Sequence, residues 1–257
     1  MKLAYIVSLY FGTRRVQAAG YRQERLFYLQ QHLKQLSTLK HSCSKVIFVI
    51  NQTPLKNNEA IEAERATKLI QSFKKDYPEK EVETLRRENL GMSYAAWNEA
   101  LKKSCKDVDY SFLIEDDYCP VSNNFDEKFL HYFAKNEKLA YVCQLWWTHS
   151  SLYTFHAGIS NGLLSMDAYF SSGGFKINYE PGYLAGQLNQ EFFLNPLKDH
   201  GYEFRDNGDV YRNYFLNHLS ELKIYGNKDI SIDLLVDGFL SPSAASGGGG
   251  GSSMKSI

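Results

Sequence analysis

Short apolar runs alternate with amphipathic stretches along the first 150 residues of the chain. The apolar runs are brief and rich in β-branched and aromatic residues, which is typical of buried strands. They predict strands at residues 3–10 (LAYIVSLY), 45–50 (KVIFVI), 81–85, 110–114 and 139–147. The run at 81–85 is weaker, and it predicts an edge strand.

The stretches between these strands place their apolar residues at spacings of three and four, on one face of a helix. In residues 22–39 this stripe consists of Leu26, Leu29, Leu33 and Leu36. The same pattern predicts helices at residues 66–73, 93–104 and 125–135. Strands that alternate with helices predict an α/β fold: a single Rossmann-like domain with a mostly parallel central sheet and helices on both faces.

The second half of the chain is less regular. Residues 158–165 and 230–236 have strand-like patterns, and residues 183–198 have a helical one. Residues 241–257 (SPSAASGGGGGSSMKSI) have the composition of a flexible linker, either an appended tail or a connection to a further domain. The folded domain is therefore expected to span residues 1–240.

Composition excludes some partners. Lys and Arg number 29, as do Asp and Glu, and a net charge of zero gives no reason to expect nucleic acid as a partner. No apolar run approaches the roughly 18 residues that a transmembrane segment needs. The cysteines show neither zinc-site nor disulfide spacing, which favours free buried thiols and a cytoplasmic protein; they are Cys43, Cys105, Cys119 and Cys143.

Three consecutive acids, Glu115, Asp116 and Asp117, follow the predicted strand 110–114 directly. Ligands bind at the carboxyl ends of parallel strands, and Asn51 follows another strand in the same way. Adjacent carboxylates repel one another, and a divalent cation such as Mg²⁺ or Mn²⁺ relieves the repulsion. If the strand continued through them, Glu115 and Asp117 would share one face. The alternative is a solvated acidic turn.

The segment from Glu88 to Leu101 (ENLGMSYAAWNEAL) predicts a tight turn that leads into a helix. Gly91 suits the turn, and Ser93 is a candidate cap for the helix. Asn98 lies near the apolar face and needs hydrogen-bond partners there. It either ties the helix to a neighbouring loop or contacts a ligand.

Together these motifs resemble the GT-A glycosyltransferases. The segment Asn89-x-Gly91-x-Ser93-x-Ala95-x-x-Asn98, followed by a strand that ends in an acid run, is most similar to the large inverting family with N-x-G-x-x-x-A-x-N before a D-x-D-type motif. The resemblance covers residues 3–120 well and residues 155–215 weakly. It implies a nucleotide-sugar-binding half (1–120), an acceptor-binding half (121–240) and a GT-A-like fold.

The resemblance also implies roles for individual residues. Asp117 matches the acid that ligates a metal, Mn²⁺ or Mg²⁺, bridging the donor diphosphate, and Glu115 matches the acid that contacts the ribose or the metal. Asn51 stands where the family usually has an acid that contacts the base or ribose. Arg86 and Arg87 are candidates for diphosphate contact or for surface charges. The residues expected to contact the nucleotide-diphosphate sugar are Ser8, Tyr10, Asn51, Arg86, Asn89, Gly91, Asn98, Glu115 and Asp116.

On the acceptor side, Glu191 matches the base that removes a proton from the attacking hydroxyl, which predicts inversion. The next residue is Phe192 where the family has Asp. Asp206 is a rival base, with a turn residue as the alternative. Candidates for a sugar-stacking platform or for core packing are Trp146, Trp147, Tyr153 and Phe155. Candidates for a late metal ligand are His149, His156, His200 and His218.

Other functions stay open. A sugar nucleotidyltransferase normally has a Gly-rich loop after the first strand, whereas residues 11–15 contain only Gly12. A non-catalytic nucleotide- or carbohydrate-binding module and a retaining glycosyltransferase are further alternatives. The donor sugar, the base and the acceptor hydroxyl compound cannot be read from these residues.

Overall fold

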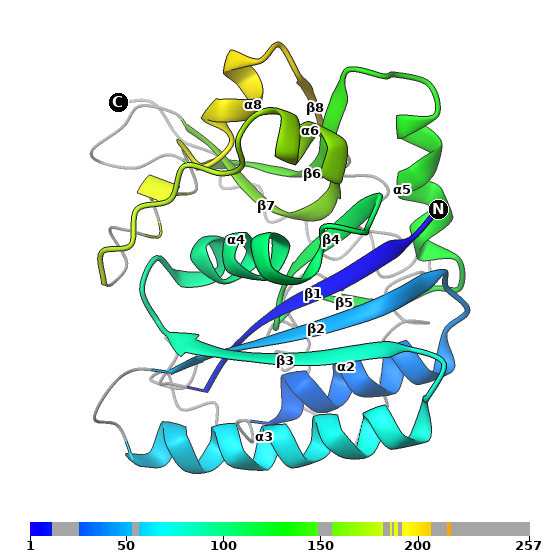
Figure 1. The fold of residues 1–257 in the computed structure, drawn as a ribbon, viewed down its shortest axis with the longest axis vertical. Helices are drawn as coiled ribbons and strands as arrows, with labels where there is room; N and C mark the ends of the chain where they lie inside the picture. The colour runs from blue at the N-terminus through cyan, green and yellow to red at the C-terminus, as the bar shows by residue number, and fades with distance from the viewer. Residues whose placement is uncertain are drawn as a thin grey trace, which may run out of the picture.

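A seven-stranded sheet forms the centre of the protein (Figure 1), in the strand order β3-β2-β1-β4-β7-β6-β8. The computed structural model describes residues 1–11, 26–52, 57–148, 156–181, 186, 188–189, 192–206 and 215–216. The strands are β1 (Leu3–Tyr10), β2 (Cys43–Gln52), β3 (Glu81–Glu88), β4 (Tyr110–Glu115), β6 (Leu139–Thr148), β7 (His156–Ser165) and β8 (Glu203–Asp206). A two-stranded antiparallel sheet pairs β5 (Cys119–Pro120) with β9 (Phe215–Leu216).

Most strands of the large sheet are parallel, as the sequence predicts. β1 pairs in parallel with β2 and β4, β2 with β3, and β6 with β8. β7 runs antiparallel to both of its neighbours, β4 and β6. The carboxyl ends of β1 to β4 therefore meet at one edge of the sheet.

Helices cover both faces of the sheet. They are α2 (Phe27–Thr38), α3 (Asn57–Asp76), α4 (Met92–Ser104), α5 (Phe125–Phe133), α6 (Met166–Ser171) and α8 (Asn195–Asp199). Figure 1 shows α4 on one side of β1 to β3, with α2 and α3 on the other. The buried side chains form two clusters to match: one joins the sheet to α2, α3 and α5, and the other joins it to α4, α6 and α8.

Alternation along the strands produces these two clusters. In β1, Leu3, Tyr5, Val7 and Leu9 join the α2–α3 cluster, whereas Ala4 and Ile6 join the α4 cluster. In α4, alanines at 95, 96 and 100 are fully buried and allow the helix to approach the sheet closely. The indole Nε1–H of Trp97 donates to the carbonyl of Ile114 at 3.2 Å, which fixes α4 against the end of β4.

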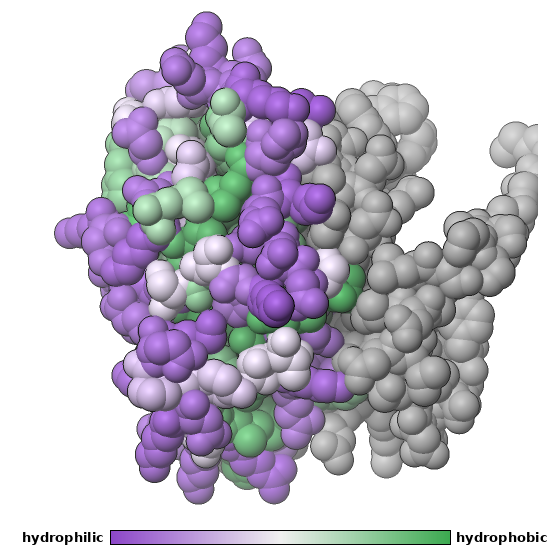
Figure 2. All heavy atoms as spheres, turned by 90° about the vertical axis from the view of Figure 1, so that its right-hand side faces the viewer, coloured by the Kyte–Doolittle hydropathy of each residue, from purple (hydrophilic) through white to green (hydrophobic). Residues whose placement is uncertain are grey.

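The amino ends of the strands form the opposite edge, on the right of Figure 1. Figure 2 faces this side of the molecule, and most of its coloured surface is hydrophilic. Lys45, whose side chain is 5% exposed, pairs with Glu81 at 2.7 Å and with Glu83 at 3.0 Å. Lys2 pairs with Glu81 and Asp107. These ion pairs join the starts of β1, β2 and β3.

The structure confirms the strands and helices predicted for the first half. Most of their ends shift by a few residues, but α3 begins at Asn57, nine residues before the start of the helix predicted at 66–73. Gly91, and not Ser93, is the N-cap of α4, because the chain takes its left-handed turn one residue before the helix. α6 and β8 were not predicted, since both are short and lack a clear periodicity. The helix predicted at 183–198 is described only in part, with α8 at its end, and residues 230–236 and 241–257 lie outside the described residues.

No helix in the described parts of the chain has both the length and the apolar character that crossing a membrane requires. All four cysteines are buried, and none of them forms a disulfide. The absence of disulfides among them agrees with their spacing in the sequence.

Candidate functional site

Strand register gathers several predicted site residues at the carboxyl edge of the sheet. Ser8 of β1 lies beside Glu115 of β4, and Tyr10 lies beside Asn51 of β2. Asn51 in turn lies beside Arg87 of β3. Ser8, Asn51 and Arg87 continue the strand faces that pack against α4, so these three side chains are on the same side of the sheet.

The acid run begins at the last residue of β4. The strand ends at Glu115, and Asp116 and Asp117 form a turn that is closed by a hydrogen bond from the Tyr118 N–H to the Glu115 carbonyl at 3.1 Å. The strand does not continue through the acids, so strand alternation does not place Glu115 and Asp117 on one face. Asn161, which is fully buried in β7, accepts the Glu115 N–H through Oδ1.

The three acids have different environments. Asp116 is 5% exposed, and its Oδ2 accepts the backbone N–H of Tyr10 at 3.0 Å. This contact ties the end of β1 to the acid turn. Glu115 and Asp117 are partly exposed. Of the three carboxylates, these two are therefore the better placed to meet a ligand.

The chemistry of Glu115 and Asp117 suits one kind of metal binding. No group of three or more His, Cys, Asp or Glu among the described residues is arranged to hold a metal ion. Two carboxylates are hard oxygen donors, and Mg²⁺ is commonly held by one or two carboxylates together with substrate phosphates. Glu115 and Asp117 therefore have the donor chemistry for a cation whose other ligands come from a diphosphate.

A buried histidine forms a hydrogen bond with the backbone of the acid turn. His32 of α2 is fully buried, with Nε2 3.0 Å from the Asp116 carbonyl and Nδ1 3.1 Å from the Tyr5 hydroxyl. A carbonyl only accepts, so Nε2 carries the hydrogen and the Tyr5 hydroxyl donates to Nδ1. Burial lowers the pKa of His32 to about 4, against smaller opposing effects of the Asp116 carbonyl and the Asp117 charge. His32 is therefore neutral at pH 7.

His32 belongs to none of the motifs that mark a site in the sequence. Its position in the predicted helix 22–39, three residues after Leu29 and four before Leu36, is the only feature of the sequence that indicates a buried side chain. That position lies on the buried stripe of the helix. A polar ring on a buried stripe needs hydrogen-bond partners, and here the acid turn supplies one of them.

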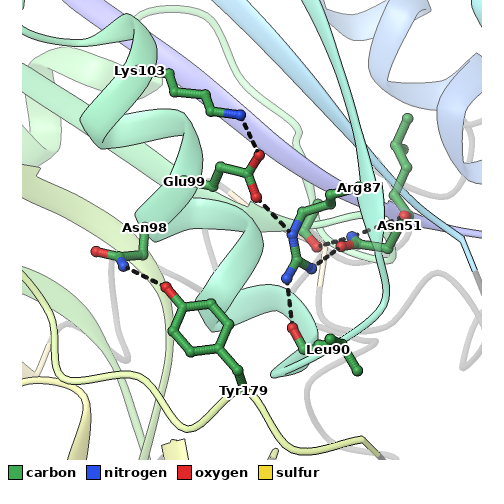
Figure 3. Close-up of polar contacts among 9 residues, drawn as sticks. Asn51, Arg87, Leu90, Asn98, Glu99, Lys103 and Tyr179 are labelled. Atoms are coloured by element: carbon green, nitrogen blue, oxygen red, sulfur yellow. Dashed lines mark hydrogen bonds and ion pairs between the residues drawn. The ribbon is translucent and has the colours of Figure 1, made fainter.

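Asn51 and Arg87 form a polar network at the ends of β2 and β3 (Figure 3). Arg87 donates to Asn51 Oδ1 at 2.6 Å, to the Leu90 carbonyl at 2.6 Å and to Glu99 Oε2 at 3.1 Å. Asn51 is 2% exposed, and its Nδ2 donates to Ser8 Oγ at 3.0 Å and to the Leu9 carbonyl at 3.1 Å. One continuous chain of hydrogen bonds thus joins α4, β3, β2 and β1.

Arg86 lies apart from this network. Its guanidinium donates to Glu64 at 2.6 Å and to Thr67 at 2.7 Å, and both residues belong to α3. Consecutive residues of a strand point to opposite faces, so Arg86 faces α3 while Arg87 faces α4. The structure therefore does not bring Arg86 together with Ser8 and Asn51.

The turn before α4 is held from two directions. The Asn89 N–H donates to the Gln52 carbonyl at 2.8 Å, and the Gly91 N–H donates to the Glu180 carbonyl at 3.2 Å. Gly91 has φ +69°, and a Cβ there would lie 2.6 Å from the Asn178 carbonyl oxygen. Both the backbone conformation and the space require glycine.

Asn189 holds the same turn, although it is not among the residues predicted from the sequence. Its side chain is 1% exposed and donates to the carbonyls of Gly91 at 3.1 Å and Asn178 at 2.8 Å. Its Oδ1 accepts the Asn178 N–H at 2.6 Å. No local pattern in the sequence marks this residue, because its partners come from two distant segments.

Asn98 ties α4 to its neighbours. Its Oδ1 accepts the Tyr169 hydroxyl at 2.7 Å, and its Nδ2 donates to the half-exposed Tyr179 hydroxyl at 3.2 Å (Figure 3). This confirms the expectation that Asn98 pins the helix to a nearby loop. Direct contact of Asn98 with a ligand stays a prediction.

Several predicted residues lie outside what the structure describes. Glu191, the predicted base, is one of them. Tyr153, Phe155, His149 and His218 are also outside the described residues, as are the side chains of Trp146, Trp147, His156 and Asp206. Of the candidate late metal ligands, His200 is exposed at the C-cap of α8, and its Nδ1 lies 2.7 Å from the Pro196 carbonyl.

Comparison with known proteins gives matches in structure only. No protein-family model matches the chain, and no curated protein matches it in sequence. Among solved structures, it is similar to a 4-diphosphocytidyl-2C-methyl-D-erythritol synthase from Anaerococcus prevotii, at 12% identity and a TM-score of 0.46, over 80% of this chain and 86% of that one. A CMP:2-keto-3-deoxy-manno-octonic acid synthetase complexed with CTP matches at 10% identity and a TM-score of 0.48, over 80% and 89% of the two chains.

A glycosyltransferase is also among these matches. The catalytic domain of Drosophila beta1,4galactosyltransferase 7 is 12% identical, with a TM-score of 0.37, over 81% of this chain and 65% of that one. Structural similarity at this level does not show which of these activities the present chain has. The mostly parallel α/β fold rests on the strand order described above.

Proposed function

We propose that this protein is a glycosyltransferase that moves a sugar from a nucleotide-diphosphate sugar to an acceptor hydroxyl. The observation that carries the proposal is the carboxyl edge, where Ser8 lies beside the partly exposed Glu115 and accepts a hydrogen bond from Asn51. The partly exposed Asp117 follows in the turn after β4. Ligands of open parallel sheets bind at this edge. The order of the N-x-G segment and the acid run along the chain supports the same proposal.

In this proposal the nucleoside lies along the ends of β1 and β2, near Tyr10. Glu115 and Asp117 would hold a divalent cation, which when bound supplies positive charge beside the donor diphosphate. Glu191 takes the proton of the acceptor hydroxyl as that oxygen attacks the anomeric carbon from the side opposite the diphosphate. The product then has inverted configuration at that carbon.

Binding is tested first, because it does not require a known acceptor. The melting temperature is measured with UDP-, GDP-, ADP- and dTDP-sugars, with and without Mn²⁺, for the wild type and for Asp117→Asn. A donor at one hundred times its Kd adds about 2.7 kcal/mol of stability. For a chain of this size that corresponds to a rise of about 5–10 °C. The rise should require Mn²⁺ and should be lost in Asp117→Asn.

Asp76→Asn is the matched control, since Asp76 is exposed at the far end of α3. It makes the same chemical change away from the site and should keep the metal-dependent rise. No rise with any donor, in a wild type shown to be folded by circular dichroism, would overturn the proposal. Loss of the rise in both variants would show that the effect is not specific to the acid turn.

Activity separates glycosyl transfer from nucleotidyl transfer. Release of a nucleoside diphosphate from the donor identifies glycosyl transfer, and Glu191→Gln should reduce it by about 10²–10⁴-fold. Release of pyrophosphate from a nucleoside triphosphate and a sugar 1-phosphate identifies nucleotidyl transfer. The second result without the first would replace the proposal with a sugar nucleotidyltransferase.

A further inference from the structure

We propose that Arg87 is a positioning residue of the nucleotide-binding edge, which acts through Asn51 and the turn at Leu90, and that it is not a phosphate ligand. The inference rests on the proposed function and concerns the same edge. It assigns a role to a buried cation that the sequence placed among the candidates for diphosphate contact.

The guanidinium of Arg87 faces into the protein. Its side chain is 7% exposed, and each of its three nitrogens donates a hydrogen bond to a protein acceptor. An arginine that binds phosphate presents its forked N–H groups to the ligand. Here the two terminal nitrogens point to the Asn51 side chain and the Leu90 carbonyl (Figure 3).

The charge of Arg87 is also compensated within the protein. Glu99 of α4 accepts from Arg87 Nε at 3.1 Å and from Lys103 at 2.6 Å. Burial alone would raise the pKa of Glu99, but the hydrogen bonds and charges of Lys103 and Arg87 outweigh it and lower that pKa. Glu99 is therefore ionised and offsets the charge that a diphosphate would otherwise meet.

Arg87 fixes the orientation of the Asn51 amide. A cation accepts no hydrogen bond, so Asn51 must turn its oxygen to Arg87 and its NH₂ group to β1. Both Nδ2 contacts, to Ser8 Oγ and the Leu9 carbonyl, depend on that orientation. The Leu9 carbonyl, which only accepts, favours the same orientation, so the amide is held from both sides. Without Arg87 the Asn51 oxygen loses its charged partner, and the amide keeps only the contacts to β1.

Arg87 also fixes the turn that leads into α4. Its bond to the Leu90 carbonyl lies next to the Gly91 cap, and the bond from the Asn89 N–H to the Gln52 carbonyl joins the same turn to β2. One side chain thus sets the spacing between the β2 end and the start of α4. A nucleotide bound at this edge would depend on that spacing, although it never touches Arg87.

The first test compares nucleosides with their diphosphates by titration calorimetry. The probes are uridine, cytidine, guanosine and thymidine and their 5′-diphosphates, the latter with Mn²⁺. Arg87→Met should weaken a nucleoside and its diphosphate by the same factor, about tenfold, a size typical of residues that orient ligand-binding groups. Arg87→Lys should not restore binding, since an ammonium cannot reproduce the fork. Selective loss of diphosphate binding would overturn the inference.

The second test needs no ligand. Melting temperatures are measured for Arg87→Met, Asn51→Ala and the double variant. If Arg87 acts through Asn51, the two decreases in melting temperature should not add. The decrease in the double variant should be smaller than the sum of the decreases in the two single variants, by about 4 °C or more. Arg86→Met is the matched control, because this neighbouring arginine faces α3, and its loss should add to that of Asn51→Ala.

The two tests separate the inference from the proposed function. Additive losses for Arg87 and Asn51 would overturn the inference even if nucleotides bind. A wild type that binds none of the eight probes would instead count against the proposed function. In that case the melting temperatures of Arg87→Met, Asn51→Ala and the double variant would still support or overturn the coupling between Arg87 and Asn51.

Discussion

The buried ring of His32 makes the stability of the protein depend on pH in a defined way. The folded state holds His32 neutral with a pKa of about 4, whereas in the unfolded chain the pKa returns to its ordinary value of 6.5. Between these values the unfolded chain binds a proton that the folded protein does not. Stability must therefore fall as the pH drops from about 7 to about 4.

The size of this loss follows from the two pKa values. The interval between 6.5 and about 4 corresponds, at 1.36 kcal/mol per pH unit, to about 3 kcal/mol of unfolding free energy. Burial lowers the pKa of His41 as well, so the wild type has a further contribution of the same sign. A variant that lacks only His32 is needed to isolate the first effect.

His32→Gln provides this comparison. Its amide can donate to the Asp116 carbonyl and accept from the Tyr5 hydroxyl, but it does not titrate. Urea unfolding of both proteins from pH 4 to pH 8 should show the wild type losing about 3 kcal/mol more than the variant across this range. His41 and the carboxylates contribute to both proteins and cancel in the difference.

A difference in unfolding free energy that stays constant with pH would refute this reasoning. It would mean that His32 takes up a proton in the folded state as readily as in the unfolded chain. NMR of ¹³C-labelled histidine gives an independent reading. The His32 ring signals should remain those of a neutral imidazole down to about pH 5.

Two further predictions concern glycine and cysteine. Gly91→Ala should cost about 1–3 kcal/mol more than Gly201→Ala in urea unfolding, because both have positive φ but only at Gly91 would a Cβ meet a backbone oxygen, that of Asn178; equal losses would show that the turn relaxes freely. The native thiols should react with Ellman's reagent at pH 8 far more slowly than after unfolding in urea, since burial raises the pKa of Cys105 to about 11 and that of Cys43 and Cys119 further still. Rapid reaction of the native protein would contradict the burial of these residues.

Much of the fold was predictable because its signals are local. The apolar runs fix where β1, β2 and β4 lie, and their β-branched residues fix the type of element. Glu115 follows β4 directly, so its place at the carboxyl edge follows from the sequence once a parallel sheet is assumed. The edge position of β3 agrees with its weaker apolar run at residues 81–85.

The hydrogen-bond partners of the acid turn cannot be predicted from the local sequence. Sequence predicts three acids at a strand end, but it does not predict that Asp116 turns inward to the Tyr10 N–H. That choice depends on how far β1 extends past the end of β4, which is set by strand pairing. Nor does the helical pattern of residues 22–39 predict that His32 reaches the same turn.

The sequence by itself determined the strands and helices of the first half of the domain and the face that each buries, because hydrophobic periodicity depends only on near neighbours. Tertiary structure decided which polar groups meet. Arg86 and Arg87 are adjacent and chemically identical, yet register and strand alternation send one to α3 and the other to Asn51, 36 residues away. His32 meets Asp116 across 84 residues for the same reason. Such partners depend on how whole elements pack, and no local pattern records that packing.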